Sequence, residues 1–114
     1  MIYKALSLKQ PYANWIAVGK KTIETRKWKT SYRGDLVICS SHTIDIEPKG
    51  FALCVVELYD IRPMTLEDQE AACVEIYDNA YAWLIRDLRI IDPIFPVKGK
   101  LSIFEIDVPE IRFK

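Results

Sequence analysis

Residues 19–28 gather side chains that can bind anions, transfer protons and stack on aromatic rings. Lys21 and Arg26 can supply affinity for phosphate or carboxylate groups. Glu24 stands alone among cations, where it can accept a hydrogen bond from the edge of a base or handle a proton. Trp28 offers a face on which a base can stack. A hydrophobic core does not require this mixture, so these residues are the first candidates for a site.

Each of these side chains also has a purely structural interpretation. Lys21 is either an exposed lysine on a turn or a group that binds phosphate, and burial would lower its pKa enough for it to accept a proton. Glu24 and Arg26 lie two residues apart, so a strand points both to one side, where they form an ion pair or bind a ligand. Trp28 shares that side in an ideal strand and either stacks on a base or covers the sheet.

Further candidates for ligand contacts lie outside this stretch. Gln10 can read a base through its amide or cap the helix that follows it, and Lys9 and Lys98 are candidate phosphate contacts. His42, the single histidine, is either a loop residue or a general base. Trp83 lies in an apolar strand pattern, which favours a place in the core.

The formal net charge of zero hides an asymmetry along the chain. Residues 1–33 carry eight Lys and Arg against Glu24 alone, a net charge of +7, and residues 34–114 carry −7. Arg33 closes the basic segment and joins the candidate ligand contacts. The segment is either a solvated face or a local basic surface for a nucleic acid or an acidic protein.

The 114 residues suit a single domain over 1–114, half hydrophobic and 28% charged. No apolar run approaches the ~20 residues that span a bilayer, and the N-terminus lacks a signal-peptide pattern, so we expect a cytoplasmic protein without a membrane partner. Three separated cysteines argue against a disulfide framework, and Cys39 and Cys54 lie in apolar runs typical of buried positions. One histidine and scattered thiols lack metal-ligand spacing, so we expect neither a metal nor another cofactor.

Periodicity predicts more strands than helices. A short helix begins at Pro11 and ends before Gly19, and a second is expected over 66–77, capped by Thr65 with Asp68. Pro93 and Pro96 indicate irregular structure after residue 91. The expected strands are 2–8, 22–28, 36–40, 51–62, 80–91 and 101–108. This pattern predicts an α+β, mostly β fold, a small mixed barrel or highly curved sheet of about six strands with two or three short helices at its ends.

Several blocks of the sequence resemble the ASCH domain family. The family signature G-x-K-x-x-E-x-R is met at every fixed position by Gly19, Lys21, Glu24 and Arg26. The other matching blocks, in order along nearly the whole chain, are residues 6–13 (LSLKQPYA), 32–34 (YRG), 81–83 (YAW) and 96–99 (PVKG).

The resemblance implies a β-barrel related to the PUA domain, with a cleft lined by the signature strand and the Lys-Gln-Pro turn. It implies a role connected with RNA, and it raises the chance that Trp83 borders the cleft. Our leading interpretation is a protein that binds RNA or a modified nucleoside around Lys21, Glu24 and Arg26.

Two alternatives remain open. Small bacterial members of the family hydrolyse N4-acetylcytidine with a lysine, a threonine and a later glutamate, and another member is described as a ribonuclease. Lys21 matches that lysine, but Glu24 stands in place of the threonine, and a carboxylate cannot replace a hydroxyl nucleophile in the same acyl transfer. Lys21 and Glu24 are the catalytic candidates of a hydrolase, and Glu57 and Glu75 the candidates for the later glutamate. The other alternative is a protein-interaction module whose basic segment meets an acidic partner.

Overall fold

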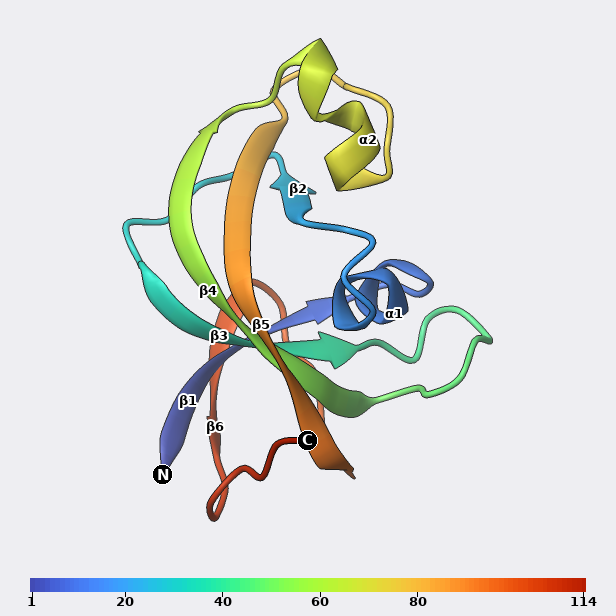
Figure 1. Cartoon of the computed structure of the whole chain (residues 1–114), viewed down its shortest axis with the longest axis vertical. Coiled ribbons are helices and arrows are strands. Elements are labelled where there is room, and N and C mark those ends of the chain that lie inside the picture. Colours follow the sequence, from blue (N-terminus) through green and yellow to red (C-terminus); the bar gives the residue numbers. More distant parts are fainter.

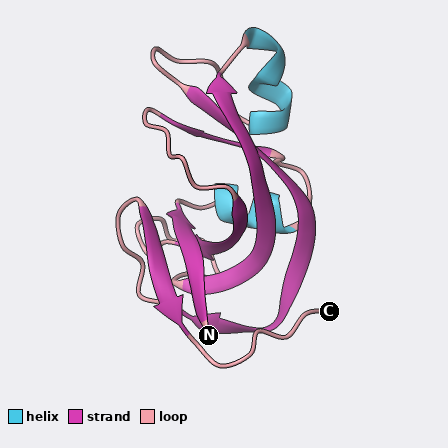
Figure 2. Ribbon diagram, turned by 90° about the vertical axis from the view of Figure 1, so that its left-hand side faces the viewer, coloured by secondary structure: helices cyan, strands magenta, loops and turns pink.

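Six strands form one strongly curved sheet in the computed structural model of the protein, which describes residues 1–114 (Figures 1 and 2). The sheet order is β2-β5-β4-β3-β1-β6, with β1 and β3 parallel and every other neighbouring pair antiparallel. The strands are β1 (Ile2–Leu8), β2 (Ile23–Arg26), β3 (Gly34–Ser40), β4 (Phe51–Pro63), β5 (Tyr81–Pro96) and β6 (Ile103–Asp107). The predicted mostly β class with about six strands is confirmed, as a curled half-barrel with β2 and β6 at its edges.

The curvature arises mainly in β4 and β5, which run diagonally through the length of the molecule (Figure 1). Their pairing register shifts at three places, between Ala52 and Cys54, between Val55 and Glu57, and between Leu58 and Asp60. An extra residue on one strand bends it and increases its twist. One long pair of strands can therefore carry β1, β3 and β6 at one end and β2 at the other.

The first helix is confirmed. α1 (Tyr12–Ala17) follows β1 and packs on β1, β3 and β4, with Ala13 and Ile16 buried. Gly19 has φ +80° and donates its N–H to the carbonyl of Ile16 at 3.0 Å. It therefore ends the helix in the left-handed conformation that glycine favours.

The predicted helix over 66–77 is wrong beyond its first turns. The structure has a 3-10 turn, Leu66–Asp68, followed by α2 (Gln69–Ala72), and the predicted capping box of Thr65 and Asp68 is present. The chain leaves the helix at Cys73, which has φ 58°. The carbonyls of Ala71 and Ala72 accept hydrogen bonds from Thr22 N–H and from the Lys21 amine, not from a further helical turn.

The irregular structure predicted after residue 91 is also wrong, because β5 continues to Pro96. Pro93 lies in the bulged stretch between Ile90 and Phe95, which pair with Cys54 and Ala52. A proline is tolerated at a bulge or a strand end because no ladder hydrogen bond needs its missing N–H. The other strand boundaries differ from expectation by a few residues.

Alternating residues of the central strands fill two apolar clusters. Leu36 and Ile38 of β3 pack in one cluster with Trp83, whereas Val37 and Cys39 pack in the other with Ile91. Cys39 and Cys54 are fully buried, as predicted, and burial raises the pKa of each thiol to about 12. No helix in the structure has the length and apolar character needed to cross a membrane.

Candidate ligand-binding site

A cavity of about 800 Å³ opens beside the edge strand β2. Its walls come from the ends of β1 and β3, from α1, from β2 and the residues before it, and from the segments that follow α2 and β5. We call it the main cavity. Four of the nine predicted ligand contacts line it: Lys9, Lys21, Glu24 and Arg26.

Lys21 is the innermost charged group of the main cavity. Only 1% of its side chain is exposed, and its Nζ donates a hydrogen bond to the carbonyl of Ala72. The same nitrogen lies 3.5 Å from Glu24 Oε1 and 5.2 Å from the centre of the Tyr12 ring. Burial lowers the pKa of Lys21, because an ammonium loses hydration there, and the Glu24 carboxylate offsets part of that effect.

Glu24 and Arg26 point to one side of β2, as their two-residue spacing predicts. Arg26 donates from Nε to Glu24 Oε2 at 3.0 Å, and its Nη2 lies 2.9 Å from the same oxygen. Nη2 also donates to the carbonyl of Ser7 at 3.2 Å, which ties β2 to β1. The other carboxylate oxygen, Oε1, accepts the N–H of Thr25 at 3.0 Å.

Lys21, Glu24 and Arg26 thus form one chain of charges, which we call the charged triad. The exposed fraction of the side chain rises along it from 1% in Lys21 to 10% in Glu24 and 24% in Arg26. Two cations share one carboxylate, so the triad carries a net positive charge while Lys21 is protonated. It can hold an anionic or carbonyl-bearing ligand through Arg26, and Lys21 can give or take a proton.

Several residues that line the main cavity were not predicted from the sequence. Tyr12 and Tyr77 add aromatic rings, Val74 adds an apolar surface, and Lys100 adds a cation. Residues 40–43 add hydroxyl groups, and His42, which the sequence left open as a loop residue or a general base, is exposed and lines the cavity. Tyr12 lies in the matched block 6–13, which is the only sequence signal for it. Val74 and Tyr77 reach the cavity only because the chain turns at Cys73, within a segment expected to be helical.

The two tryptophans proposed as ligand contacts do not line the main cavity. Trp83 is completely buried, and its indole Nε1 donates to the carbonyl of Trp28 at 3.2 Å. The two rings pack edge to face, 4.8 Å between centroids. β2 ends at Arg26, so Trp28 leaves the side of Glu24 and covers the core. Both indoles therefore pack with the core, and neither faces the main cavity.

Gln10 is also a structural residue. Its side chain is buried, and its amide donates to Asn14 Oδ1 at 2.9 Å and to the Pro48 carbonyl at 3.0 Å. Its own Oε1 accepts the backbone N–H of Asn14 at 3.0 Å. Gln10 therefore caps α1 and fastens the loop before β4, which leaves no free amide for a base.

Arg33 and Lys98 do not line the main cavity. Arg33 donates to the carbonyls of Thr30 and Tyr32, both at 2.8 Å, so its guanidinium braces the turn before β3. Lys98 is exposed and lines a second, smaller hollow. Arg33 lines neither hollow.

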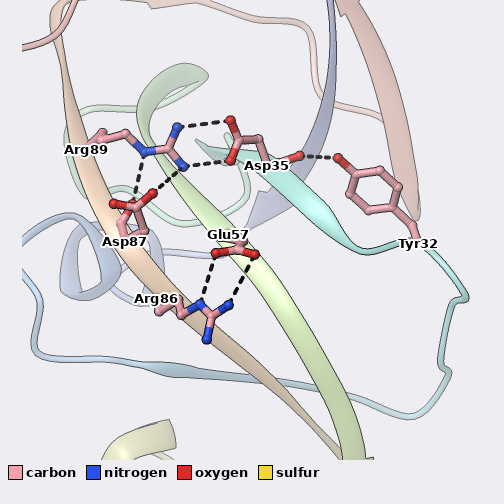
Figure 3. A network of polar contacts seen from close by, with 6 residues as sticks. All are labelled: Tyr32, Asp35, Glu57, Arg86, Asp87 and Arg89. Carbon is pink, nitrogen blue, oxygen red and sulfur yellow. Dashed lines mark hydrogen bonds and ion pairs between the residues drawn. The ribbon is translucent and has the colours of Figure 1, made fainter.

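A second polar network, on β3, β4 and β5, explains why Glu57 cannot serve the main cavity (Figure 3). Glu57 accepts from Arg86 at 2.9 and 3.4 Å, outside the cavity lining. Beside it, Asp35 accepts from Arg89 at 2.7 and 3.0 Å. We call Asp35, Glu57, Arg86 and Arg89 the cross-strand network.

Glu75, the other candidate for the later glutamate, is exposed and also lies outside the cavity lining, so neither Glu57 nor Glu75 reaches the charged triad. No cluster of three or more His, Cys, Asp or Glu side chains is placed to hold a metal ion.

Comparison with known proteins identifies the family of the chain. The family model of the ASCH domain matches residues 6–95. The solved structure of ASCH from Zymomonas mobilis superimposes with a TM-score of 0.69 at 17% sequence identity, covering 91% of this chain and 87% of that one. A tyrosine-to-phenylalanine variant of the same bacterial protein gives 0.67 at 16% identity, with 91% and 89% coverage.

At these identities the structural likeness supports the fold alone, and no curated protein matches the sequence. The family model carries the assignment, because it spans most of the chain and contains the whole charged triad. The chain belongs to the ASCH domain family, whose members are PUA-like and generally bind RNA.

Proposed function

We propose that the protein binds a nucleotide of RNA, or a modified nucleoside, in the main cavity. The observation that carries this proposal is the charged triad on the wall of an open cavity of about 800 Å³. Ligand pockets of proteins typically measure about 300–1,000 Å³ and combine apolar walls with a few placed polar groups. The volume of the main cavity lies in that range, and its lining combines apolar residues such as Val74 and Leu101 with a larger number of polar side chains.

The polar groups of the cavity suit the functional groups of a nucleotide. Arg26 uses Nε and Nη2 for Glu24 and Ser7, while its Nη1 makes no hydrogen bond within the protein. That free donor can bind a phosphate oxygen or a base carbonyl. Tyr12 and Tyr77 supply aromatic surface that can contact a base. Glu24 holds the guanidinium in place rather than meeting the ligand itself.

Arg26→Ala tests the proposal most simply. We expect affinity for nucleoside 5′-monophosphates and for a short single-stranded RNA to fall by roughly tenfold, the effect of losing one charge-assisted contact. Lys27→Ala is the matched control, because Lys27 is the next residue along, is exposed and lies outside the cavity. Unchanged affinity in Arg26→Ala, measured by isothermal titration calorimetry, would overturn the proposal.

A second candidate function is hydrolysis of an acylated nucleobase such as N4-acetylcytidine. The observation in its favour is the lowered pKa of the buried Lys21, which suits a group that transfers protons. Glu24, at the threonine position of the known hydrolases, is engaged by Lys21 and Arg26. Incubation with N4-acetylcytidine decides the matter: absence of cytidine, where a known amidohydrolase produces it, excludes this activity.

A further inference from the structure

A second hollow of about 460 Å³ adjoins the main cavity. We call it the side hollow. It lies between the start of β4, with the loop before it, and the end of β5, with the segment after it, and Lys98 is part of its wall. His42 and Gly99 line both spaces, so the two hollows are adjacent and meet at these residues.

The junction between the two spaces depends on close approaches at two glycines. A Cβ atom on Gly50 would lie 2.1 Å from His42 Nε2, so the imidazole rests directly against the backbone of Gly50. A Cβ atom on Gly99 would lie 2.9 Å from Ser7 Oγ. Gly50 is held on both sides, since its N–H donates to Ser40 at 2.9 Å and its carbonyl accepts from Val97 at 2.8 Å.

The charges along the two adjacent hollows have one sign. Lys9 and Lys100 of the main cavity and Lys98 of the side hollow are exposed and make no ion pair. Lys49 is neutralised by Asp45 at 2.9 Å. No carboxylate lines the side hollow, and the only one in the main cavity belongs to the charged triad. Free cations on both sides of the junction suit a ligand with more than one phosphate.

We propose that the protein binds a single strand of RNA across both spaces. One nucleotide occupies the main cavity, the connecting phosphate passes His42, and the next phosphate meets Lys98 beside the side hollow. The inference rests on the proposed function, and it names an RNA strand rather than a free nucleoside as the ligand. A free nucleoside would fill the main cavity only and would leave Lys98 without a partner.

Two probes distinguish binding in the main cavity alone from binding across both hollows. They are a fluorescent ten-nucleotide RNA of random sequence, and unlabelled nucleoside 5′-monophosphates as competitors. For Lys98→Ala we expect decamer affinity to fall about three- to tenfold. The slope of log affinity against log salt should shrink by about 0.7, the value for one phosphate contact on a single strand. Competition by the monophosphates should stay at the wild-type level, and Lys27→Ala should change neither probe.

The outcomes distinguish this inference from the proposed function. If Lys98→Ala keeps the wild-type affinity and salt slope while Arg26→Ala weakens both probes, the two-space path is wrong and the proposed function stands. If Arg26→Ala changes neither probe, the proposed function fails as well. Displacement of the decamer by polyglutamate as readily as by unlabelled RNA would also overturn the inference, because the path would then be a site for acidic peptides.

Discussion

The charged triad and the cross-strand network both contain ion pairs between an arginine and a carboxylate, and the pairs are similar in length. Arg26 lies 2.9 Å from Glu24, and Arg89 lies 2.7 Å from Asp35. The two pairs differ in exposure, since 10% of the Glu24 side chain is exposed against 55% for Asp35. Charges removed from water depend on one another, whereas exposed pairs are screened by solvent and salt. Burial beside a cavity, and not the presence of an ion pair, therefore distinguishes the candidate site from an ion pair on the surface.

The largest expected effect is on stability, in the buried region. Glu24→Ala removes the only carboxylate shared by Lys21 and Arg26 and leaves two cations without compensation. We expect a loss of about 3 kcal/mol in the free energy of unfolding, the usual cost of breaking a buried pair. Urea denaturation followed by tryptophan fluorescence measures it. A loss no larger than that of an exposed pair would show that solvent reaches the triad.

The next largest effect is on ligand affinity, and it is measured by replacing Arg26 or Arg89 with lysine. Arg26→Lys keeps the charge but loses the guanidinium fork, whose Nε and Nη2 bind Glu24 while Nη1 makes no hydrogen bond within the protein. We expect RNA affinity to fall about threefold to tenfold. Arg89→Lys serves as the matched control and should bind as the wild type does, because Arg89 lies outside both hollows. Equal losses in the two variants would indicate that charge acts over the whole surface.

A third effect concerns pH. The lowered pKa of Lys21 means that the folded protein binds fewer protons than the unfolded chain between that pKa and the ordinary lysine value of 10.5. Stability from this group should therefore rise as the pH rises through that window. Lys21→Met should remove the rise, which the difference between wild-type and variant unfolding free energies at several alkaline pH values would reveal. A difference that does not vary with pH would contradict the assigned burial.

The smallest effect belongs to the cross-strand network. Asp35→Ala breaks the pair with Arg89 on an exposed part of the sheet, so we expect a loss below about 1 kcal/mol. The Arg89 guanidinium lowers the pKa of Asp35, so this contribution is present above the carboxyl's ordinary pKa and disappears as the pH falls through the lowered one. Denaturation of wild type and variant at neutral and acidic pH checks both statements.

Local patterns predicted most of the fold. The alternation over residues 2–8 and the glycine at 19 specify β1 and the end of α1, because each depends on neighbours in sequence. The helix expected over 66–77 failed for a non-local reason: Lys21 and Thr22 take the carbonyls that a longer helix would need. Pro93 led to the wrong prediction of irregular structure for a similar non-local reason, because a bulge against β4 accommodates the proline within β5.

The residues of the candidate site also fall into two groups: those that a local sequence pattern predicts, and those that only the folded chain brings together. Lys21, Glu24 and Arg26 could be predicted because one short segment holds them and period two orients two of them. Tyr77 and Lys100 could not, because only the folded topology brings residues so distant in sequence to β2. Trp28 and Trp83 were named as candidate contacts with a core position as the alternative, and both pack with the core, as aromatic residues near a signature often do.

Mapping the ligand on the protein by NMR tests the central claim most directly. A short single-stranded RNA titrated into nitrogen-15-labelled protein should shift the backbone amides of β2, of residues 40–43 and of residues 99–102, which surround the main cavity. The amides around Asp35 and Arg89 should stay unchanged. Shifts concentrated on the cross-strand network, with none along β2, would contradict the account.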